Sequence, residues 1–529
     1  MRSFDSYGPV DCRMNFCVHR RGLIERCAGQ LIGDIDEGGR YFTIWAPRQT
    51  GKTWIMRQVR DDIQARYNDR FVVGTMSVQG TILKKDDTED SFLTNVPMLI
   101  WETFKSRIDI PKNWQAFKGL FDRAGGIFDH PVILFIDEFD SLPPKVIDTL
   151  VTMFRDMYLK RDSYLLHGLA LIGVRAVLGV DSERGSPFNI QRSTHIPNFT
   201  REEVSELFQQ YIAESGQNIG PTVVDKLYQV TRGQPGLVCW FGELLTEKYN
   251  PGIATTIDIA LFERVYHMAL RREWNNTVLN LVKKAQGLYK EQVVSLFTRS
   301  DIPFSMDKDW CNYLYMNGII DIEVVPDNMG DKIDTCRFSS AFVQERIYNA
   351  LTDVLVGDNL PIPALQLLDT LDDVFESERL NLPALLQRYK DYLMRLTAKG
   401  FNPWQSQPRR ADLNYTEAVG HFHLYAWLQA AIGRRCIVSP EFPTGNGKVD
   451  LHLRCGDIEA IIEVKSLTNL SELRGDKEQA ARYARSLGKD SVTIALFVPS
   501  HDEDIHAQLS QEHIVEQVKV TVVSIGWAT

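Results

Sequence analysis

The sequence has no run of about 18 apolar residues, the length that a membrane-spanning helix needs. Its first residues include Arg2 and Asp5 and lack the apolar stretch of a signal peptide. It also has no internal repeat and no low-complexity segment. We therefore expect a cytoplasmic protein that makes no contact with a membrane.

Cysteine patterns typical of metal sites are also missing. The eight cysteines include no Cys-x-x-Cys pair, and no histidine stands at a spacing suited to zinc. We expect them to be reduced thiols, in the core or at the surface. Their positions are 12, 17, 27, 239, 311, 336, 436 and 455.

The chain has no excess of basic residues, since 59 Lys and Arg face 69 Asp and Glu and give a formal net charge of -10. This balance argues against a surface coated with basic charge, and it leaves a local basic groove for DNA open. Scattered residues such as Arg388, Lys390, Arg395, Lys399, Arg409 and Arg410 could form such a groove or could simply be solvated.

Length and pattern indicate several domains, because 529 residues exceed what one hydrophobic core holds. Apolar strands at 41–45, 71–76, 132–137 and 169–174 alternate with amphipathic helices, the first from Lys52, as in an α/β parallel sheet. Thr200 and Glu203 form a capping box that opens a helical stretch. The predicted segments are 1–199 as an α/β core, 200–257 as a helical lid, 258–352 as a winged helix, 353–379 as a linker and 380–529 as a last domain.

A phosphate-binding loop is predicted at Ala46-Pro-Arg-Gln-Thr-Gly51-Lys52-Thr53, between a strand and a helix. Its residues are Ala46, Pro47, Arg48, Gln49, Thr50, Gly51, Lys52 and Thr53. Backbone N–H groups would cradle phosphates, Lys52 would neutralise β and γ oxygens, and Thr53 would ligate Mg²⁺. Ala46 replaces the usual first glycine, but a residue before proline favours β geometry and need not have a positive φ. The loop predicts ATP binding.

A second motif supports this prediction. The segment Pro131-Val-Ile-Leu-Phe-Ile-Asp137-Glu138 is a continuous apolar strand that ends in two acids, as in a Walker B motif. Asp137 would hold Mg²⁺, and Glu138 would polarise the attacking water.

From about residue 10 to 350 the chain resembles AAA-like, STAND-type ATPases. Ile172-Gly-Val-Arg175 is similar to their sensor-1 strand, and the resemblance implies that Arg175 reaches the γ-phosphate. Val18-His-Arg20-Arg21 and Thr231-Arg-Gly-Gln-Pro235-Gly are similar to segments that lie near the adenine. For Arg20, Arg21 and Pro235 an ordinary structural role stays open.

The C-terminal order of elements is predicted as α-β-β-β-α-β, with a two-residue turn at Gly456-Asp457. Residues paired across this hairpin then have numbers that sum to 913, so that Asp450 pairs with Glu463. Because like charges in such a pair are destabilising, a divalent metal between them is the natural remedy. Lys465 would share the face of Glu463 and could orient water.

Asp450 with Glu463-Val-Lys465 in this order of elements resembles the PD-(D/E)XK nuclease superfamily. Val449 stands where the name-giving proline would be. Glu417 falls where many members have an additional acid, and Gln479 and Tyr483 resemble the Gln-x-x-x-Tyr helix of recombination nucleases. The resemblance implies a site that binds Mg²⁺ or Mn²⁺ through Asp450 and Glu463.

Together these patterns predict an ATP-hydrolysing enzyme whose ATPase module gates a Mg²⁺-dependent deoxyribonuclease, an architecture suited to bacterial or mobile-element defence. The alternative is a nucleotide-dependent switch that binds DNA or protein through an inactive nuclease fold. DNA is the expected partner, and a homo-oligomer or a regulatory partner protein is left open. The winged helix has an acidic candidate recognition helix from Met306, so docking is expected there rather than DNA contact.

Overall fold

A computed structural model describes residues 1–529 apart from 9, 68, 80–88, 174–192, 298–301, 327–331, 358–359, 367–368, 377–378, 405–416, 442–449, 457, 468, 487, 501 and 528–529. The chain divides into two compact units, which are 1–277 with 315–318, and 278–314 with 319–529. The predicted winged-helix segment is therefore shared between the two units. Within the described part of the chain, no helix combines the length and apolarity needed to cross a membrane.

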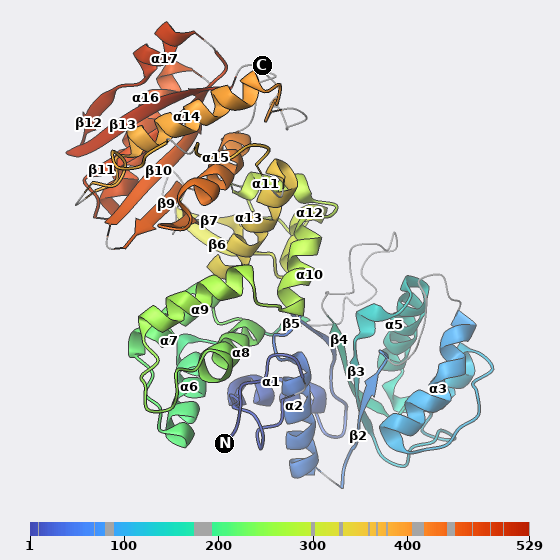
Figure 1. The fold of residues 1–529 in the computed structure, drawn as a ribbon. Coiled ribbons are helices and arrows are strands. Elements are labelled where there is room, and N and C mark those ends of the chain that lie inside the picture. The colour runs from blue at the N-terminus through green and yellow to red at the C-terminus, as the bar shows by residue number, and fades with distance from the viewer. Residues whose placement is uncertain are drawn as a thin grey trace. The chain divides into compact units, whose positions relative to one another are not determined.

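The first unit is built on a five-stranded parallel sheet in the order β2-β3-β4-β1-β5 (Figure 1). The α/β parallel fold predicted for residues 1–199 is confirmed. Two strands deviate from their predicted bounds by one to three residues at their ends. The strands are β1 (Tyr41–Trp45), β2 (Val72–Ser77), β3 (Val132–Asp137), β4 (Leu166–Gly173) and β5 (Ser193–His195).

Helices cover both faces of this sheet, because alternate residues of each strand are apolar on opposite sides. On one face Phe42 and Ile44 of β1 pack with α1 (Arg21–Ile32) and α2 (Lys52–Tyr67). On the other face Leu134 of β3 packs with α3 (Glu89–Phe104), α4 (Trp114–Gly119) and α5 (Pro144–Leu159). A sheet buried on both faces leaves its strand ends for ligands.

The lid of the first unit is helical, as predicted from residue 200. Its helices are α6 (Arg201–Ser215), α7 (Pro221–Thr231), α8 (Pro235–Glu243) with a π-helical turn Leu244–Lys248, and α9 (Ile259–Arg271). The capping box is present, since Thr200 accepts a hydrogen bond from the Glu203 N–H and the Glu203 carboxylate accepts one from the Thr200 N–H.

The second unit begins with helices and a β-hairpin. The helices are α10 (Asn276–Ala285), α11 (Lys290–Leu296), α12 (Asp309–Met316) and α13 (Ala341–Val356), and α10 and α12 each have a few residues in the first unit. The strands β6 (Ile320–Pro326) and β7 (Lys332–Phe338) pair antiparallel. Helix α13 continues past residue 352, where the winged helix was predicted to end.

A six-stranded mixed sheet follows, in the order β12-β13-β11-β10-β9-β8. The elements from α15 to β11 have the predicted α-β-β-β-α-β order. The strands β12 and β13 extend the sheet beyond what the sequence pattern predicted. These elements are α14 (Leu382–Ala398), α15 (Glu417–Ile432), β8 (Ile437–Glu441), β9 (Asp450–Cys455), β10 (Ile458–Ser466), α16 (Leu470–Ser486), β11 (Ser491–Val498), α17 (Glu503–Leu509), β12 (Glu512–Val515) and β13 (Val518–Gly526).

Helix α13 belongs to the same core as α15. The Tyr348 hydroxyl of α13 is hydrogen-bonded to the His421 ring, and Tyr425 of α15 donates a hydrogen bond to the Asn349 side chain over 2.6 Å. These buried polar contacts tie the helix that follows the hairpin to the mixed sheet.

The prediction that all cysteines are reduced thiols is wrong. Cys12 is joined to Cys17, and Cys436 is joined to Cys455. Cys436 precedes β8 and Cys455 ends β9, so this second bond links two neighbouring strands. The other four, Cys27, Cys239, Cys311 and Cys336, are free and buried.

Candidate functional site

The predicted phosphate-binding loop joins β1 to α2 at the carboxyl end of the parallel strands. Positive φ angles occur at Gln49 (57°) and Gly51 (85°), and Ala46 needs none. Ala46 is fully buried, and Thr50 donates a hydrogen bond to the Pro47 carbonyl over 2.8 Å. The loop is therefore closed by its own side chains, with the start of helix α2 directly behind it.

Lys52 is the cation at the centre of this loop. Its ammonium group donates to the carbonyls of Ala46 (2.9 Å) and Pro47 (2.7 Å). Burial lowers the pKa of Lys52 to about 8, although the nearby carboxylates of Asp140, Asp137 and Glu138 oppose this change. Burial disfavours the charged ammonium group, and an anionic phosphate bound beside it would stabilise that charge.

Thr53 and Asp137 are in contact at the carboxyl ends of the parallel strands. The Thr53 hydroxyl donates to Oδ2 of Asp137 over 3.3 Å, and Oδ1 of Asp137 accepts a bond from the Glu138 N–H over 2.9 Å. Burial raises the pKa of Asp137. A hydroxyl oxygen and a carboxylate oxygen are the hard ligands that Mg²⁺ prefers, so these two residues fit the metal that the motif implies.

Glu138 follows at the end of β3 in a left-handed conformation (φ 57°, ψ 32°), which is rare for a residue other than glycine. Burial, and then the charge of Asp137, raise the pKa of Glu138, which suits a carboxylate that accepts a proton from water. A third acid, Asp140, lies beside Lys52 and Gly173. No motif identified Asp140, because it stands in a short 3₁₀ turn after the strand.

A cavity of about 120 Å³ adjoins the loop. Its walls come from the N-terminal segment 5–20, from the loop residues Gln49 to Gly51 and from the lid residues Phe199, Pro235 and Gly236. The lining is mainly apolar, as expected for a planar base, and the volume is smaller than the roughly 300–1,000 Å³ of whole-ligand pockets. The cavity therefore suits part of a nucleotide, with phosphates on the loop.

Arg20 lines this cavity and also holds the lid. Its guanidinium group lies 2.9 Å from the Glu203 carboxylate and donates to the carbonyls of Pro197 (2.8 Å) and Asn198 (3.1 Å). The side chain is only 7% exposed. These three interactions, one with the lid and two with the segment that leads into it, support a structural role for Arg20, and Arg21 is exposed at the start of α1.

Pro235 is the buried first residue of α8 and lines the cavity, as expected from the sequence. The next residue, Gly236, donates its N–H to the Gln49 carbonyl over 2.9 Å. The Gln234 side chain donates to the carbonyls of Arg48 (3.2 Å) and Gln49 (3.3 Å). The lid therefore contacts the phosphate-binding loop directly.

The predicted sensor residue, Arg175, lies outside the described residues. The strand that leads to it, β4, ends at Gly173, which pairs with Trp45 at the end of β1. Arg175 therefore stays a prediction.

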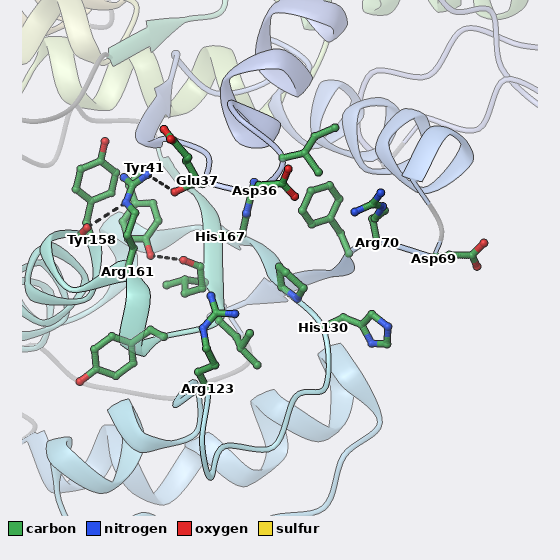
Figure 2. A pocket seen from close by; sticks show the side chains of 17 residues that line it. Asp36, Glu37, Tyr41, Asp69, Arg70, Arg123, His130, Tyr158, Arg161 and His167 are labelled. Carbon is green, nitrogen blue, oxygen red and sulfur yellow. Dashed lines mark hydrogen bonds between the residues drawn. The ribbon is translucent and has the colours of Figure 1, made fainter.

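A larger hollow, of about 300 Å³, lies at the other end of the strands, opposite the phosphate-binding loop (Figure 2). Here Tyr41 begins β1 and donates to the carbonyl of Leu166, which begins β4, and Arg161 donates to the Glu37 carbonyl. Because parallel strands bind ligands at their carboxyl ends, this hollow at their amino ends is separate from the nucleotide site.

The predicted acidic hairpin has the predicted register. Asp450 of β9 pairs with Glu463 of β10, and Arg454 pairs with Glu459, so that every pair sums to 913. Gly456 has a positive φ (64°), as a tight turn requires. Val449 and Asp457 lie outside the described residues.

Glu463 and Lys465 are buried together on this hairpin. The Lys465 ammonium group is 2.6 Å from Oε1 of Glu463, and both side chains are 2% exposed. Among the described residues, Oε2 of Glu463 has no hydrogen-bond partner. A buried carboxylate oxygen without a partner is costly unless a cation or a donor binds it, so Glu463 fits a metal ligand.

The other predicted residues of this site come from two helices. Glu417 begins α15, and its carboxylate is 4.0 Å from the Lys465 ammonium group. Gln479 and Tyr483 are half-buried on α16, which packs on the sheet face of Ile461. Strand alternation places Glu463 and Lys465 on that same face.

The sequence left open a basic groove for DNA, and some of the arginines considered for it have other partners. Arg388 pairs with Asp373 over 2.9 Å, and Arg395 donates to the Ala364 carbonyl over 2.9 Å. These two arginines have structural partners, while Arg409 and Arg410 lie outside the described residues.

A family model described as an AAA-like domain matches residues 6–324, which is more than half of the chain. The match spans the loop, the Walker B strand and the lid, and it ends within the strand β6. No curated protein matches the sequence. Residues 325–529 lie outside the family match.

Solved structures resemble 60–65% of the chain at low identity. A Walker-type ATPase of Pyrococcus abyssi is 14% identical, with a TM-score of 0.41, and the alignment covers 65% of this chain and 99% of that one. The Orc1 protein of Aeropyrum pernix, solved in complex with DNA, is 14% identical with a TM-score of 0.33, covering 64% and 93%. The RuvB Holliday junction branch migration motor of Thermotoga maritima is 13% identical with a TM-score of 0.32, covering 60% and 92%.

Proposed function

The chain belongs to the AAA-like domain family, and from this premise we propose that its P-loop ATPase gates a Mg²⁺-dependent deoxyribonuclease site on the β9–β10 hairpin. The proposal includes a STAND-type switch that serves bacterial or mobile-element defence. The ATPase part rests on the family and on the loop geometry. The nuclease part rests on the hairpin.

In the ATPase, the chain's own residues have separate tasks. Lys52 binds phosphate oxygens, and Thr53 and Asp137 would hold Mg²⁺, which offsets phosphate charge when it is bound. Glu138 accepts the proton of the attacking water, for which its raised pKa is favourable. The hydrogen bonds from Gln234 and Gly236 to the loop carry the change from ATP to ADP into the lid.

In the nuclease, Asp450 and Glu463 would hold the metal, which supplies an activated water and offsets charge on the scissile phosphate. Lys465 orients that water or stabilises the developing negative charge. Glu417 is close enough to hold Lys465 in place. Gln479 and Tyr483, on the helix that covers this face, would position the DNA backbone.

One observation carries this half of the proposal, the partnerless Oε2 of buried Glu463 next to Lys465. A purely structural ion pair would be expected to satisfy both carboxylate oxygens. The register adds a second acid, Asp450, at the paired position. The hairpin thus carries two acids at paired register positions and a lysine two residues further on, and these are groups suited to metal-assisted phosphodiester cleavage.

The test is cleavage of supercoiled plasmid and of single-stranded DNA by the full chain, with Mg²⁺ or Mn²⁺ and with or without ATP. Lys465→Ala should abolish cleavage and leave ATP hydrolysis unchanged. Lys52→Ala should weaken ATP binding and change cleavage, since the ATPase is proposed to gate it. Cleavage that is the same in wild type and Lys465→Ala would overturn the nuclease assignment.

The alternative function is a nucleotide-dependent switch with an inactive nuclease fold that binds DNA or a partner protein. The close contact between Lys465 and Glu463 favours it, because a lysine engaged in a buried ion pair is less available for catalysis. ATP-dependent DNA binding without metal-dependent cleavage would support this alternative.

A further inference from the structure

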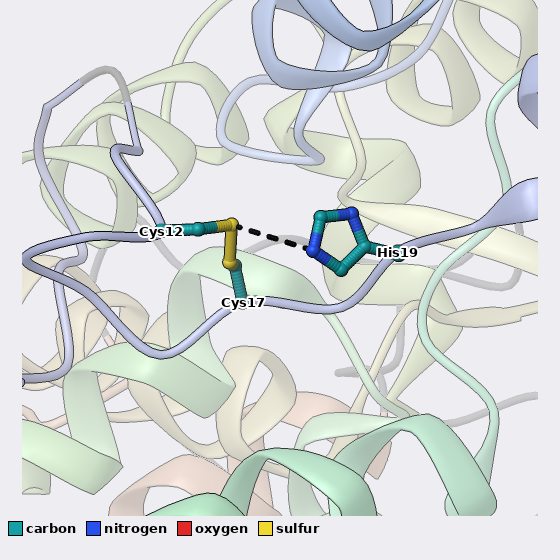
Figure 3. A group of neighbouring side chains, drawn as sticks. All are labelled: Cys12, Cys17 and His19. Carbon is teal, nitrogen blue, oxygen red and sulfur yellow. Dashed lines mark hydrogen bonds between the residues drawn. A yellow bond between two sulfur atoms is a disulfide. The ribbon is translucent and has the colours of Figure 1, made fainter.

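Three potential metal ligands meet in the N-terminal segment of the first unit (Figure 3). They are the sulfur atoms of Cys12 and Cys17 and the ring nitrogen Nε2 of His19, all within 4.8 Å of one another. Cys12 Sγ is 3.8 Å from His19 Nε2, and the two cysteines are joined as a disulfide. The spacing of these residues, Cys-x₄-Cys-x-His, differs from the Cys-x-x-Cys pattern typical of zinc sites, so the sequence did not reveal the cluster.

The orientation of the His19 ring is fixed by a neighbouring helix. His19 Nδ1 lies 3.1 Å from the Oε1 atom of Gln58 on α2. Because a carboxamide oxygen only accepts hydrogen bonds, this contact favours the tautomer in which Nδ1 carries the proton and the lone pair of Nε2 faces the Cys12 sulfur. Metal-binding histidines typically donate their other N–H to an oxygen in this way.

We propose that Cys12, Cys17 and His19 form a zinc site when the disulfide is reduced. A dithiol reductant cleaves the S–S bond, giving two thiols and becoming a disulfide itself. Zn²⁺ then replaces the two thiol protons and is held by two thiolates and the imidazole, which are the soft and borderline ligands it prefers. The fourth position takes water.

There is room for that fourth ligand. Cys12 and His19 line a hollow of about 450 Å³, together with Trp54 and Arg57 of α2. Cys12 is half-buried and His19 is exposed, so zinc and reductant can reach the site from solvent. Three protein ligands with one open position make a complete zinc coordination sphere with water.

The zinc site adjoins the nucleotide cavity, which Cys17 and Val18 line. The Cys17 carbonyl accepts a hydrogen bond from Gln210 of the lid over 2.9 Å, and the Val18 carbonyl accepts one from Trp54 over 3.2 Å. Oxidation of the pair expels zinc and replaces its ligand geometry with a direct S–S bond. The redox state of this segment therefore acts on the wall of the nucleotide cavity.

The experiment uses the full chain, reduced with a phosphine that is then removed, and titrated with Zn²⁺ or Co²⁺. Wild type should bind about one zinc at this site with release of about two protons. Co²⁺ should give the absorption bands of a thiolate-bound tetrahedral ion. Cys12→Ser should remove the bands, and Gln58→Leu should weaken affinity about 10- to 100-fold.

The matched control is Cys311→Ala, which removes a thiol from a different close cysteine pair, Cys311 with Cys336, and should leave the bands unchanged. Circular dichroism shows whether each variant is folded, and Cys17→Ser serves if Cys12→Ser is not. No zinc uptake by the reduced wild type, or uptake and bands that Cys12→Ser and Cys17→Ser leave unchanged, would overturn the proposal. These readouts do not involve ATP or DNA.

Discussion

The ammonium nitrogen of Lys465 lies 2.6 Å from Oε1 of Glu463, and each side chain is only 2% exposed. The second carboxylate oxygen, Oε2, has no hydrogen-bond partner within the part of the chain that the structure describes. Lys465 thus provides a counter-charge at Oε1, and Oε2 can bind a cation. Stability and metal binding at this pair can therefore be tested separately.

Removing one charge of the pair should destabilise the second unit. Glu463→Gln leaves the buried Lys465 ammonium group with only the Glu417 carboxylate, 4.0 Å away, as a counter-charge, and breaking a buried pair costs about 3–5 kcal/mol. Urea unfolding of the full chain without metal, followed by hydrogen exchange of the β10 amides, measures this loss.

The control for this prediction is the double variant Glu463→Gln, Lys465→Met, in which no buried charge remains. It should recover most of the lost stability, since apolar or neutral groups can replace a buried ion pair at little cost. Equal losses in the single and double variants would show that the two side chains do not stabilise each other.

The sequence was sufficient for features set by local patterns. The loop before Lys52 follows from strand–loop–helix periodicity, and the pairing of Asp450 with Glu463 follows from a tight turn at Gly456 and alternation on both strands. The burial of Lys465 with Glu463 was not predictable, because it depends on how helices pack over the strand.

Contacts between distant parts of the chain were also missed. Cys436 and Cys455 are 19 residues apart and become neighbours only because β8 pairs with β9. Asp140 reaches Lys52 from a turn that carries no motif. Such pairing and packing depend on the tertiary structure. They leave no local periodic pattern in the sequence from which they could be predicted.

Two substitutions separate ATP binding from hydrolysis. Lys52→Ala should weaken ATP binding about 10- to 100-fold, because a charged hydrogen bond contributes roughly 1.5–3 kcal/mol. Glu138→Gln should retain ATP and slow hydrolysis about 10²- to 10⁴-fold, since it removes the general base. Calorimetric binding and phosphate release measure the two effects. Turnover in Glu138→Gln equal to wild type would refute the assignment of the base.

ATP affinity should fall as the pH rises through 8. Burial lowers the pKa of Lys52 from 10.5 to about 8, so the free protein loses this charge above pH 8. Bound phosphate favours the charged form and raises the pKa again, so binding above pH 8 takes up a proton. Calorimetry in buffers of different ionisation enthalpy detects that proton.

The control for the pH effect is Lys52→Arg, whose side chain stays charged over this range. Its affinity, even if weaker overall, should not decline between pH 8 and 9.5. A wild-type affinity independent of pH, with no proton uptake, would show that Lys52 keeps its charge in the free protein.

The helix α12 should not be the main DNA contact. Lys308 directly precedes the helix and stands between Asp307 and Asp309, and all three are exposed, so phosphate is repelled as much as attracted. Lys308→Ala in the full chain should leave DNA affinity and its salt dependence unchanged in fluorescence anisotropy. A decrease of about one in the salt slope would instead identify Lys308 as a phosphate contact.

If Asp450 and Glu463 form a metal site, Asp450→Asn should stabilise the hairpin or leave it unchanged without metal; if Asp450 has a structural role, the same change should destabilise it. Like charges at paired positions are destabilising, and Mg²⁺ or Mn²⁺ relieves them, so metal should slow hydrogen exchange of the β9 and β10 amides in the full chain. Asp450→Asn should slow that exchange without metal, or leave it unchanged, while abolishing the response to metal and DNA cleavage together. If arginines hold Asp450 as a structural element, Asp450→Asn will speed exchange without metal and leave the metal response intact. Exchange in the metal-free protein therefore distinguishes a metal site from a structural element. Only in a metal site does the loss of one acidic ligand remove repulsion between the two carboxylates.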